Sequence, residues 1–250
     1  MKNIIITGAS YGLGYSIAKI VGKSFKDSTL HLISRTLSDE VKEVLSKNSK
    51  IFYYRFDLQN SHKISDLMKD IFNNIDIATS DSILLINNAA ILEPIKFSGD
   101  YNSSDIIKHI NVNITAPMIM SSEFIDYLKN FNKDKKIINI SSGAGKHPYI
   151  GWSLYCSSKA SLDMFTQNLA LEQETLKNGV KILSFAPGIV ETQMQELIRK
   201  QNKKDFPLVD KFKDLHKSNL LLSPDYVAKY LIDNFIKNDF INGMITDIRG

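Results

Sequence analysis

The chain has 250 residues, of which 43% are hydrophobic and 23% are charged, and its formal net charge is +4. These values predict one folded α/β domain over residues 1–250 and exclude a disordered or repetitive chain. The 31 basic and 27 acidic residues are spread along the sequence, which gives no support to nucleic-acid binding, and the apolar runs are too short to span a membrane.

The N-terminus, the single cysteine and the histidines narrow the class further. An apolar run already begins near residue 4, with no secretory signal before it, so we expect a cytoplasmic protein. Cys156 is the only cysteine, so neither an intramolecular disulfide nor a thiolate metal cluster can form, and we interpret it as a packed thiol. The five histidines lack ligand spacing, so we expect no metal site.

Seven short apolar or β-branched runs predict seven strands. They cover residues 3–6, 30–33, 51–54, 83–86, 137–140, 180–185 and 244–246. Each of the first six is followed by a polar turn and a stretch with helical periodicity. This alternation predicts a doubly wound parallel sheet with right-handed crossovers and helices on both faces.

A glycine-rich loop follows the first strand and reads Thr7-Gly8-Ala9-Ser10-Tyr11-Gly12-Leu13-Gly14. Glycines in this place allow a tight turn and let the N-terminus of the next helix approach a pyrophosphate. A purely structural turn is the alternative, but the position in the first strand–helix unit favours dinucleotide binding. The expected contacts are Gly8, Ser10, Tyr11, Gly12, Leu13 and Gly14.

The second strand ends in Ser34-Arg35-Thr36, where an NAD-specific site would carry an acidic residue. An arginine can pair with the 2′-phosphate of NADP, and the hydroxyls of Ser34 and Thr36 can add contacts. The sequence therefore predicts NADP(H), with an unrelated surface arginine as the alternative. Asp57 and Leu58, at the end of the third strand, are expected to hold the adenine amino group and cover its ring.

The strand–helix alternation breaks after Pro187-Gly188. Residues 192–222 contain two helix-like segments, 193–202 and 209–217, with no strand between them. An excursion after the carboxyl end of a strand lies near the ligand crevice, so we expect a substrate lid. Ser223 and Pro224 predict the cap and first residue of a last helix that ends at about Lys237.

Tyr155 and Lys159 are four residues apart in a predicted helix and therefore share one face. A neighbouring ammonium stabilises a phenolate, so we expect Lys159 to lower the pKa of Tyr155 from about 10 toward working pH. Ser142 ends the preceding strand, where its hydroxyl can orient a carbonyl group. A chance surface pair is the alternative for Tyr155 and Lys159. Asn113 lies in the long helix before that strand and can anchor water or a backbone carbonyl, or is a buried amide.

Taken in order, these motifs together with Asn87-Asn88-Ala89-Ala90 resemble the short-chain dehydrogenase/reductase family along the whole chain. The resemblance implies a Rossmann-type sheet, a nicotinamide cofactor and an Asn-Ser-Tyr-Lys set at Asn113, Ser142, Tyr155 and Lys159. Asn111 competes with Asn113 for the first role. In the family the Tyr exchanges the proton, the Lys also holds the nicotinamide ribose, and the Ser positions the carbonyl.

The resemblance also implies further cofactor contacts. A segment that begins at the Pro-Gly pair contacts the nicotinamide end in the family, and it corresponds here to residues 188–195. The contacts implied in this chain are Asn88, Ala89, Tyr155, Lys159, Pro187, Gly188, Val190 and Thr192. Two positions depart from the family pattern: Ala90 stands where Gly is usual, and Tyr11 stands where many NADP-using members carry a basic residue. Arg35 is then the main expected partner of the 2′-phosphate.

Within the family, residues 151–160, 191–195 and 242–247 resemble sepiapterin reductases and the related bacterial benzil reductases. Asp247 matches an aspartate that anchors the pterin in sepiapterin reductases, whereas a strand-end aspartate that forms turn hydrogen bonds is the alternative. The expected substrate contacts are Ser142, Tyr155, Gly188 and Asp247.

These observations lead to the hypothesis that the chain transfers hydride from NADPH to a ketone or 1,2-dicarbonyl compound, sepiapterin-like or benzil-like. NAD-linked oxidation of a secondary alcohol is one alternative, and a non-catalytic module that senses NADP(H) is another. The resemblance further suggests a homodimer formed through the helices at 103–131 and 152–178.

Overall fold

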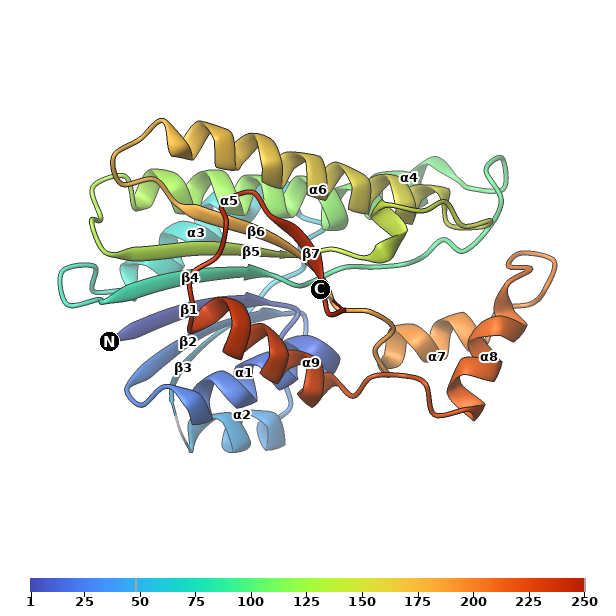
Figure 1. Ribbon diagram of the computed structural model, residues 1–250, viewed down its shortest axis with the longest axis horizontal. Helices are drawn as coiled ribbons and strands as arrows, with labels where there is room; N and C mark the ends of the chain where they lie inside the picture. Colours follow the sequence, from blue (N-terminus) through green and yellow to red (C-terminus); the bar gives the residue numbers. More distant parts are fainter. Residues whose placement is uncertain (48, 250) are drawn as a thin grey trace.

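The computed structural model describes residues 1–47 and 49–249, so Asn48 and Gly250 of the predicted domain lie outside the described residues. The strands are β1 (Lys2–Thr7), β2 (Ser28–Ser34), β3 (Lys50–Arg55), β4 (Ser82–Asn87), β5 (Asp134–Ile140), β6 (Lys181–Ala186) and β7 (Ile245–Asp247). They form one parallel sheet in the order β3-β2-β1-β4-β5-β6-β7, as Figure 1 shows. The predicted fold class is confirmed.

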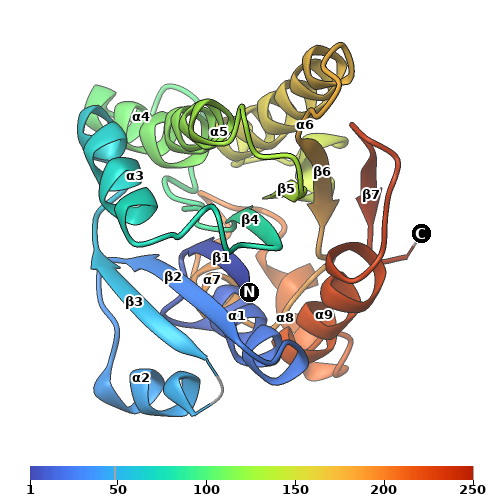
Figure 2. The same ribbon diagram turned by 90° about the vertical axis from the view of Figure 1, so that its left-hand side faces the viewer.

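Helices cover both faces of the sheet (Figure 2). One face carries α1 (Gly12–Ser24), α2 (Asp39–Ser46) and α9 (Pro224–Leu231), and the other carries α3 (Ile64–Asn73), α4 (Ser103–Ile110), α5 (Ala116–Tyr127) and α6 (Ser153–Glu174). Two apolar cores fill the layers, and β1 serves both: Ile4 and Ile6 enter one core while Ile5 enters the other. A strand buried on both faces needs a continuous apolar run, which is the pattern seen in the sequence.

The long helix expected before β5 is interrupted. A π-helical turn, Asn111–Thr115, separates α4 from α5. Pro117 has no amide hydrogen to donate to the carbonyl of Asn113, so the α-helical ladder cannot continue through this position. Asn113 therefore lies in the interruption rather than in a regular helix, which corrects the prediction.

The last helix also differs from its prediction. Ser223 caps α9 by accepting a hydrogen bond from the backbone N–H of Tyr226 at 3.2 Å, as expected. However, the α-helical part, α9, ends at Leu231, and a second π-helical turn, Ile232–Ile236, follows it directly.

Within the described ranges, no helix is long and apolar enough to cross a membrane.

The 192–222 segment contains α7 (Gln193–Arg199) and α8 (Val209–Lys217), which extend beyond the carboxyl ends of the strands in Figure 1. The second predicted helix has the observed bounds. The first ends at Arg199 instead of Asn202, because the side chain of Asn202 accepts the backbone N–H of Asp205 at 2.9 Å and forms a turn.

Candidate active site

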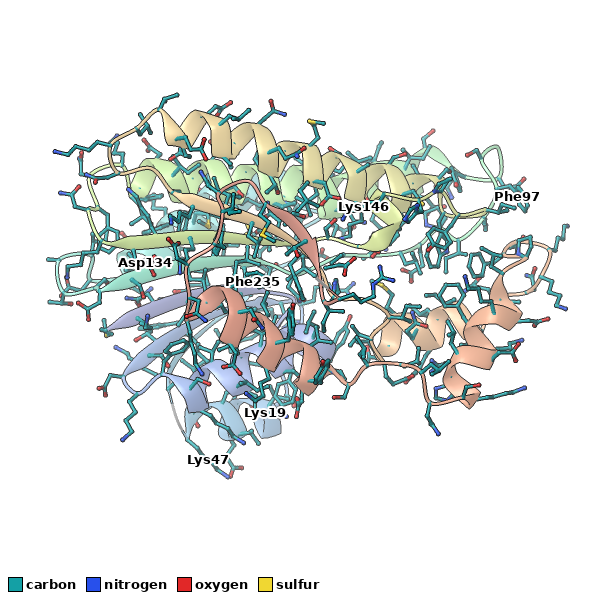
Figure 3. All side chains as sticks on the ribbon, in the orientation of Figure 1. Lys19, Lys47, Phe97, Asp134, Lys146 and Phe235 are labelled. Carbon is teal, nitrogen blue, oxygen red and sulfur yellow. The ribbon has the colours of Figure 1, made fainter. Side chains whose placement is uncertain are left out.

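The carboxyl ends of four central strands meet where the strand order reverses, between β1 and β4. Ligands bind outside this point in open α/β sheets. The glycine-rich loop follows β1, Asn88 follows β4, Ser142 follows β5, and Pro187-Gly188 follows β6. In Figure 3, Lys146, which follows β5, lies toward α7 and α8, whereas Asp134 at the start of β5 lies at the far edge.

The glycine-rich loop has the shape of a pyrophosphate cradle. Gly8 and Gly12 have positive φ values of 68° and 57°, a conformation that favours glycine. A Cβ atom at Gly14 would lie 2.2 Å from the carbonyl oxygen of Gly8, and one at Gly12 would lie 3.3 Å from the Cγ2 atom of Thr192. The first turn of α1 carries no acidic side chain, so the positive end of its dipole is left for an anion. This geometry fits a dinucleotide.

Asn88 holds the start of the glycine-rich loop by hydrogen bonds. Its side-chain amide donates to the carbonyl oxygen of Thr7 at 2.9 Å. The hydroxyl oxygen of Thr7 in turn accepts the backbone N–H groups of Asn88 and Ala89, each at 2.9 Å. These bonds join the ends of β1 and β4, so the side chain of Asn88 shapes the crevice, and a direct cofactor contact stays a prediction.

The residues expected at the adenosine end lie at the ends of β2 and β3. Arg35 and Thr36 are exposed, whereas Ser34 is buried and its hydroxyl donates to the carbonyl oxygen of Thr36 at 2.8 Å. The hydroxyl proton of Ser34 is therefore used in a hydrogen bond within the turn. The carboxylate of Asp57 accepts the backbone N–H of Gln59 at 3.1 Å and its side-chain amide at 2.7 Å.

Ser142, Tyr155 and Lys159, the candidate catalytic residues, converge, and for brevity we call them the catalytic cluster. Tyr155 and Lys159 are 7% and 3% exposed. The Nζ atom of Lys159 lies 5.7 Å from the centroid of the Tyr155 ring and donates to the carbonyl oxygen of Ile140 at 2.8 Å. The Ser142 hydroxyl lies close enough to Tyr155 to influence its pKa, and it accepts the backbone N–H of Ala144 at 3.2 Å. A buried phenol and a buried amine thus lie beside a half-buried hydroxyl.

Burial dominates the pKa values in this cluster. It raises the pKa of Tyr155 to about 12, although the Ser142 hydroxyl acts in the lowering direction. Burial also lowers the pKa of Lys159 to about 8, against the opposing effect of the Asp163 carboxylate. The expected lowering of the Tyr155 pKa was therefore wrong in direction for this structure. At neutral pH Tyr155 carries its proton and can act as an acid.

Asn113 is 1% exposed and binds a loop. Its Oδ1 atom accepts the backbone N–H of Ile91 at 2.9 Å, and its Nδ2 atom donates to the carbonyl oxygen of Ile91 at 2.7 Å. Nδ2 also lies 2.9 Å from Nε2 of His109. Asn111, the competing candidate, instead donates to the carbonyl oxygen of Gln59 at 3.1 Å. The buried position beside α6 belongs to Asn113.

Aromatic side chains line the side of Tyr155 that faces the 192–222 segment. Trp152 packs edge-on against Tyr155, with ring centroids 5.8 Å apart, and stacks on Phe206 at 5.1 Å. Phe212 packs against both Trp152 and Phe206. We call Trp152, Phe206 and Phe212 the aromatic cluster, and all three are buried.

A cavity of about 290 Å³ lies next to the aromatic cluster, beside Asp205. It is lined by Ile91, Glu93, Pro94, Ile95, Lys96, Asp105, Lys108, Gln201 and Asp205.

The chain's C-terminal segment covers the Pro-Gly pair. Gly188 has φ +75°, and a Cβ atom there would lie 3.1 Å from the side chain of Ile248. Val190 is buried and pairs with Leu222. The carboxylate of Asp247 accepts the backbone N–H of Arg249 at 2.8 Å and pairs with its guanidinium at 3.1 Å, which lowers the pKa of Asp247. These contacts match the turn-forming alternative, and a substrate contact by Asp247 stays a prediction.

Comparison with known proteins decides the family. Residues 2–203 match the short chain dehydrogenase family. The chain belongs to the short-chain dehydrogenase family. It is thus an oxidoreductase, and the family predicted from the glycine-rich loop and the Tyr155–Lys159 pair is confirmed.

Two relatives of this short-chain dehydrogenase are a benzil reductase and a sepiapterin reductase, the two kinds of enzyme that its sequence resembles. It is 40% identical to the (S)-benzoin-forming benzil reductase of Bacillus cereus over 99% of both chains. It is 29% identical to the sepiapterin reductase of Mus musculus over 97% of this chain and 94% of that protein. The solved structure of ElxO with NADP bound covers 99% of this chain and 96% of that one, with a TM-score of 0.78 and 26% identity.

Sequence reasoning missed several residues beside the catalytic cluster of this short-chain dehydrogenase. His109 lies four positions before Asn113, a spacing that places both side chains on one helical face. Trp152 lies three positions before Tyr155 and was open to the same argument. Phe206 is distant in the sequence, so only the tertiary structure brings it to Trp152.

Proposed function

We propose that this short-chain dehydrogenase reduces ketones or 1,2-dicarbonyl compounds with NADPH. The observation that carries the proposal is the catalytic cluster, in which a buried and protonated Tyr155 lies beside Ser142 and Lys159. Forty per cent identity to a benzil reductase along the whole chain supports the choice of a dicarbonyl substrate.

Tyr155 is the proton donor in this proposal. A carbonyl oxygen near its phenol would accept the hydrogen bonds of Tyr155 and Ser142, which polarise the C=O bond. As the carbonyl carbon gains a hydride, the oxygen takes the phenolic proton and becomes a hydroxyl, leaving a phenolate on Tyr155. The ammonium form of Lys159, close to the ring, stabilises that phenolate.

The cofactor is held by residues at both ends of the crevice. The glycine-rich loop and the N-terminus of α1 receive the pyrophosphate, and Arg35 receives the 2′-phosphate. Thr192, which lies against Gly12, and the segment from Pro187 would contact the nicotinamide end. When bound, NADPH supplies the hydride. The NADP-bound relative supports this choice of cofactor.

The surroundings of Tyr155 favour an aromatic, uncharged dicarbonyl over a pterin. The buried aromatic cluster packs against Tyr155 through Trp152, so the surroundings of the phenol on this side are apolar. Asp247, the expected pterin anchor, is already paired with Arg249, so a donor-rich ligand would have to break that ion pair. The packing of Phe206 on Trp152 holds the 192–222 segment beside Tyr155, which supports its role as the substrate lid.

The proposal is tested by following NADPH oxidation by the purified protein with benzil, sepiapterin, aliphatic diketones and simple aldehydes, and by repeating the series with NADH. We expect the highest kcat/KM for an aromatic diketone with NADPH. Tight NADPH binding without turnover of any of these carbonyl compounds would contradict the proposal.

The predicted homodimer belongs to this proposal as well. Ile107 of α4 and Met164 and Leu171 of α6 are 60%, 59% and 65% exposed, which is apolar surface on the two helical regions expected to pair. Light scattering at micromolar concentration should give the mass of two chains, and the mass of one chain would contradict the prediction.

A further inference from the structure

His109 is a buried titratable residue that the proposed reaction does not use. It lies at the end of α4 and is 0% exposed. Its ring contacts the loop after β4, the π-helical turn and α6, and it meets the Tyr155 ring edge-on with centroids 6.4 Å apart. A polar ring enclosed in this way must have its hydrogen bonds satisfied by its neighbours.

The neighbours of His109 determine which ring nitrogen carries the proton. Nδ1 lies 2.8 Å from the carbonyl oxygen of Glu93, which can only accept, so Nδ1 is protonated. On the other side, Nδ2 of Asn113 lies 2.9 Å from Nε2. The orientation of that amide is fixed, because its oxygen accepts the N–H of Ile91. The amide nitrogen must donate, so Nε2 of His109 accepts and the ring is neutral.

The same contacts join the loop to the catalytic helix. Asn113 and His109 hold the two ends of residues 91–93 through Ile91 and Glu93. Nε2 of His109 and Nδ2 of Asn113 also lie 3.3 Å from the hydroxyl of Ser158, which donates to the carbonyl oxygen of Tyr155 at 2.8 Å. Ser158 directly precedes Lys159, so the network reaches α6 between the two catalytic side chains.

The 91–93 loop also borders a cavity. Ile91 and Glu93 line the cavity of about 290 Å³ beside the 192–222 segment. One side of the loop therefore forms the wall of the cavity, and the other side is held by His109 and Asn113. A small shift of this loop would change the cavity and the surroundings of Tyr155 together.

We propose that His109 is a positioning residue of this reductase. As the neutral ring with a proton on Nδ1, it holds the 91–93 loop and the amide of Asn113 against the helix that carries Tyr155 and Lys159. The inference rests on the proposed carbonyl reduction for its kinetic effect, but its structural content does not depend on the substrate.

Protonation of His109 would break this arrangement, because a proton on Nε2 would face the donating amide of Asn113. Burial lowers the pKa of His109, and the Lys159 ammonium on α6 acts in the same direction, whereas Glu93 of the loop and the backbone of Leu154 on α6 oppose both. The charged ring is therefore disfavoured at neutral pH. Protonation of His109 should therefore make carbonyl reduction decline in acid.

The kinetic test compares His109→Phe, His109→Gln and the exposed control His62→Phe. Phenylalanine provides an aromatic ring without the two nitrogens. The carbonyl oxygen of Glu93 and one N–H of the Asn113 amide then lose their partner on residue 109. We expect about a tenfold loss of kcat/KM for the diketone, while the KM for NADPH changes by less than about twofold. Glutamine can donate to Glu93 and accept from Asn113, so it should restore most of the activity and remove the decline in acid.

Wild-type kcat/KM in His109→Phe would overturn the proposal, as would equal losses in the Phe and Gln variants. If His109→Phe does not fold, nitrogen NMR of the wild-type histidine rings decides the matter. We expect a proton on Nδ1 and none on Nε2 at neutral pH. The opposite tautomer, or a charged ring, would overturn the inference even if the wild-type protein reduced no diketone, which separates this failure from a failure of the proposed function.

Discussion

The two ends of the crevice are built differently. At the proposed adenosine end, the glycine-rich loop presents little side-chain bulk and Arg35 is exposed. At the catalytic end, Tyr155, Lys159, Asn113 and His109 are all buried and already hydrogen-bonded or packed within the protein. Changes at the first end should therefore alter affinity, whereas changes at the second should alter rates and pKa values.

Tyr155→Phe should separate the two ends most sharply. The substitution removes only the phenolic hydroxyl, so the proton donor is lost while the packing against Trp152 is kept. We expect kcat to fall by roughly 10² to 10⁴, with the NADPH Kd unchanged, as measured by steady-state kinetics and fluorescence titration. Tyr226→Phe, at an exposed tyrosine of α9, is the control. A Tyr155→Phe enzyme with wild-type kcat would rule out the assigned proton donor.

Arg35→Ala tests the adenosine end alone. Because a hydrogen-bonded ion pair with the 2′-phosphate is lost, NADPH binding should weaken by about tenfold to a hundredfold. NADH has no such phosphate, so its Kd should not change. Lys26→Ala removes the same charge from another exposed position. Equal effects of Arg35→Ala on NADPH and NADH would show that Arg35 does not read the 2′-phosphate.

The pH dependence of kcat reports on the catalytic end. With its pKa raised to about 12, Tyr155 keeps its proton throughout the neutral range. The pKa of Lys159 is lowered to about 8, so its ammonium is present below that pH and is lost as the pH rises through it. Carbonyl reduction should therefore be steady near neutrality and decline above about pH 8. A rate that rises through this range would contradict the assigned roles.

Cys156→Ala should have the smallest effect, although Cys156 is next to Tyr155. Its thiol is half-buried, burial raises its pKa, and its sulfur lies 3.7 Å from the carbonyl oxygen of His147. Removing the sulfur should lower the free energy of unfolding by about 1 kcal/mol and leave kcat unchanged. Thermal unfolding and the standard assay measure both, and a large loss of kcat would show that the thiol takes part in catalysis.

Local patterns were enough to predict the sheet and the NADP(H) cofactor. The glycine-rich loop, the strand-end arginine and the continuous apolar run of β1 each follow from neighbouring residues. The interruption at Asn113 depends on Pro117 and on the distant Ile91, so regular periodicity could not reveal it. The Tyr155 pKa was predicted from its helical neighbour Lys159, but burial by segments far away in the sequence raised it instead.

The central claim is that the chain reduces a dicarbonyl compound by coupling NADPH oxidation to proton donation from a buried tyrosine. Its most direct test is a single-turnover experiment in which the protein saturated with one equivalent of NADPH is mixed with benzil. The account predicts that the NADPH absorbance disappears as one equivalent of benzoin forms, and that Tyr155→Phe binds NADPH but does neither. NADPH that stays bound and unoxidised in the wild-type protein would contradict it.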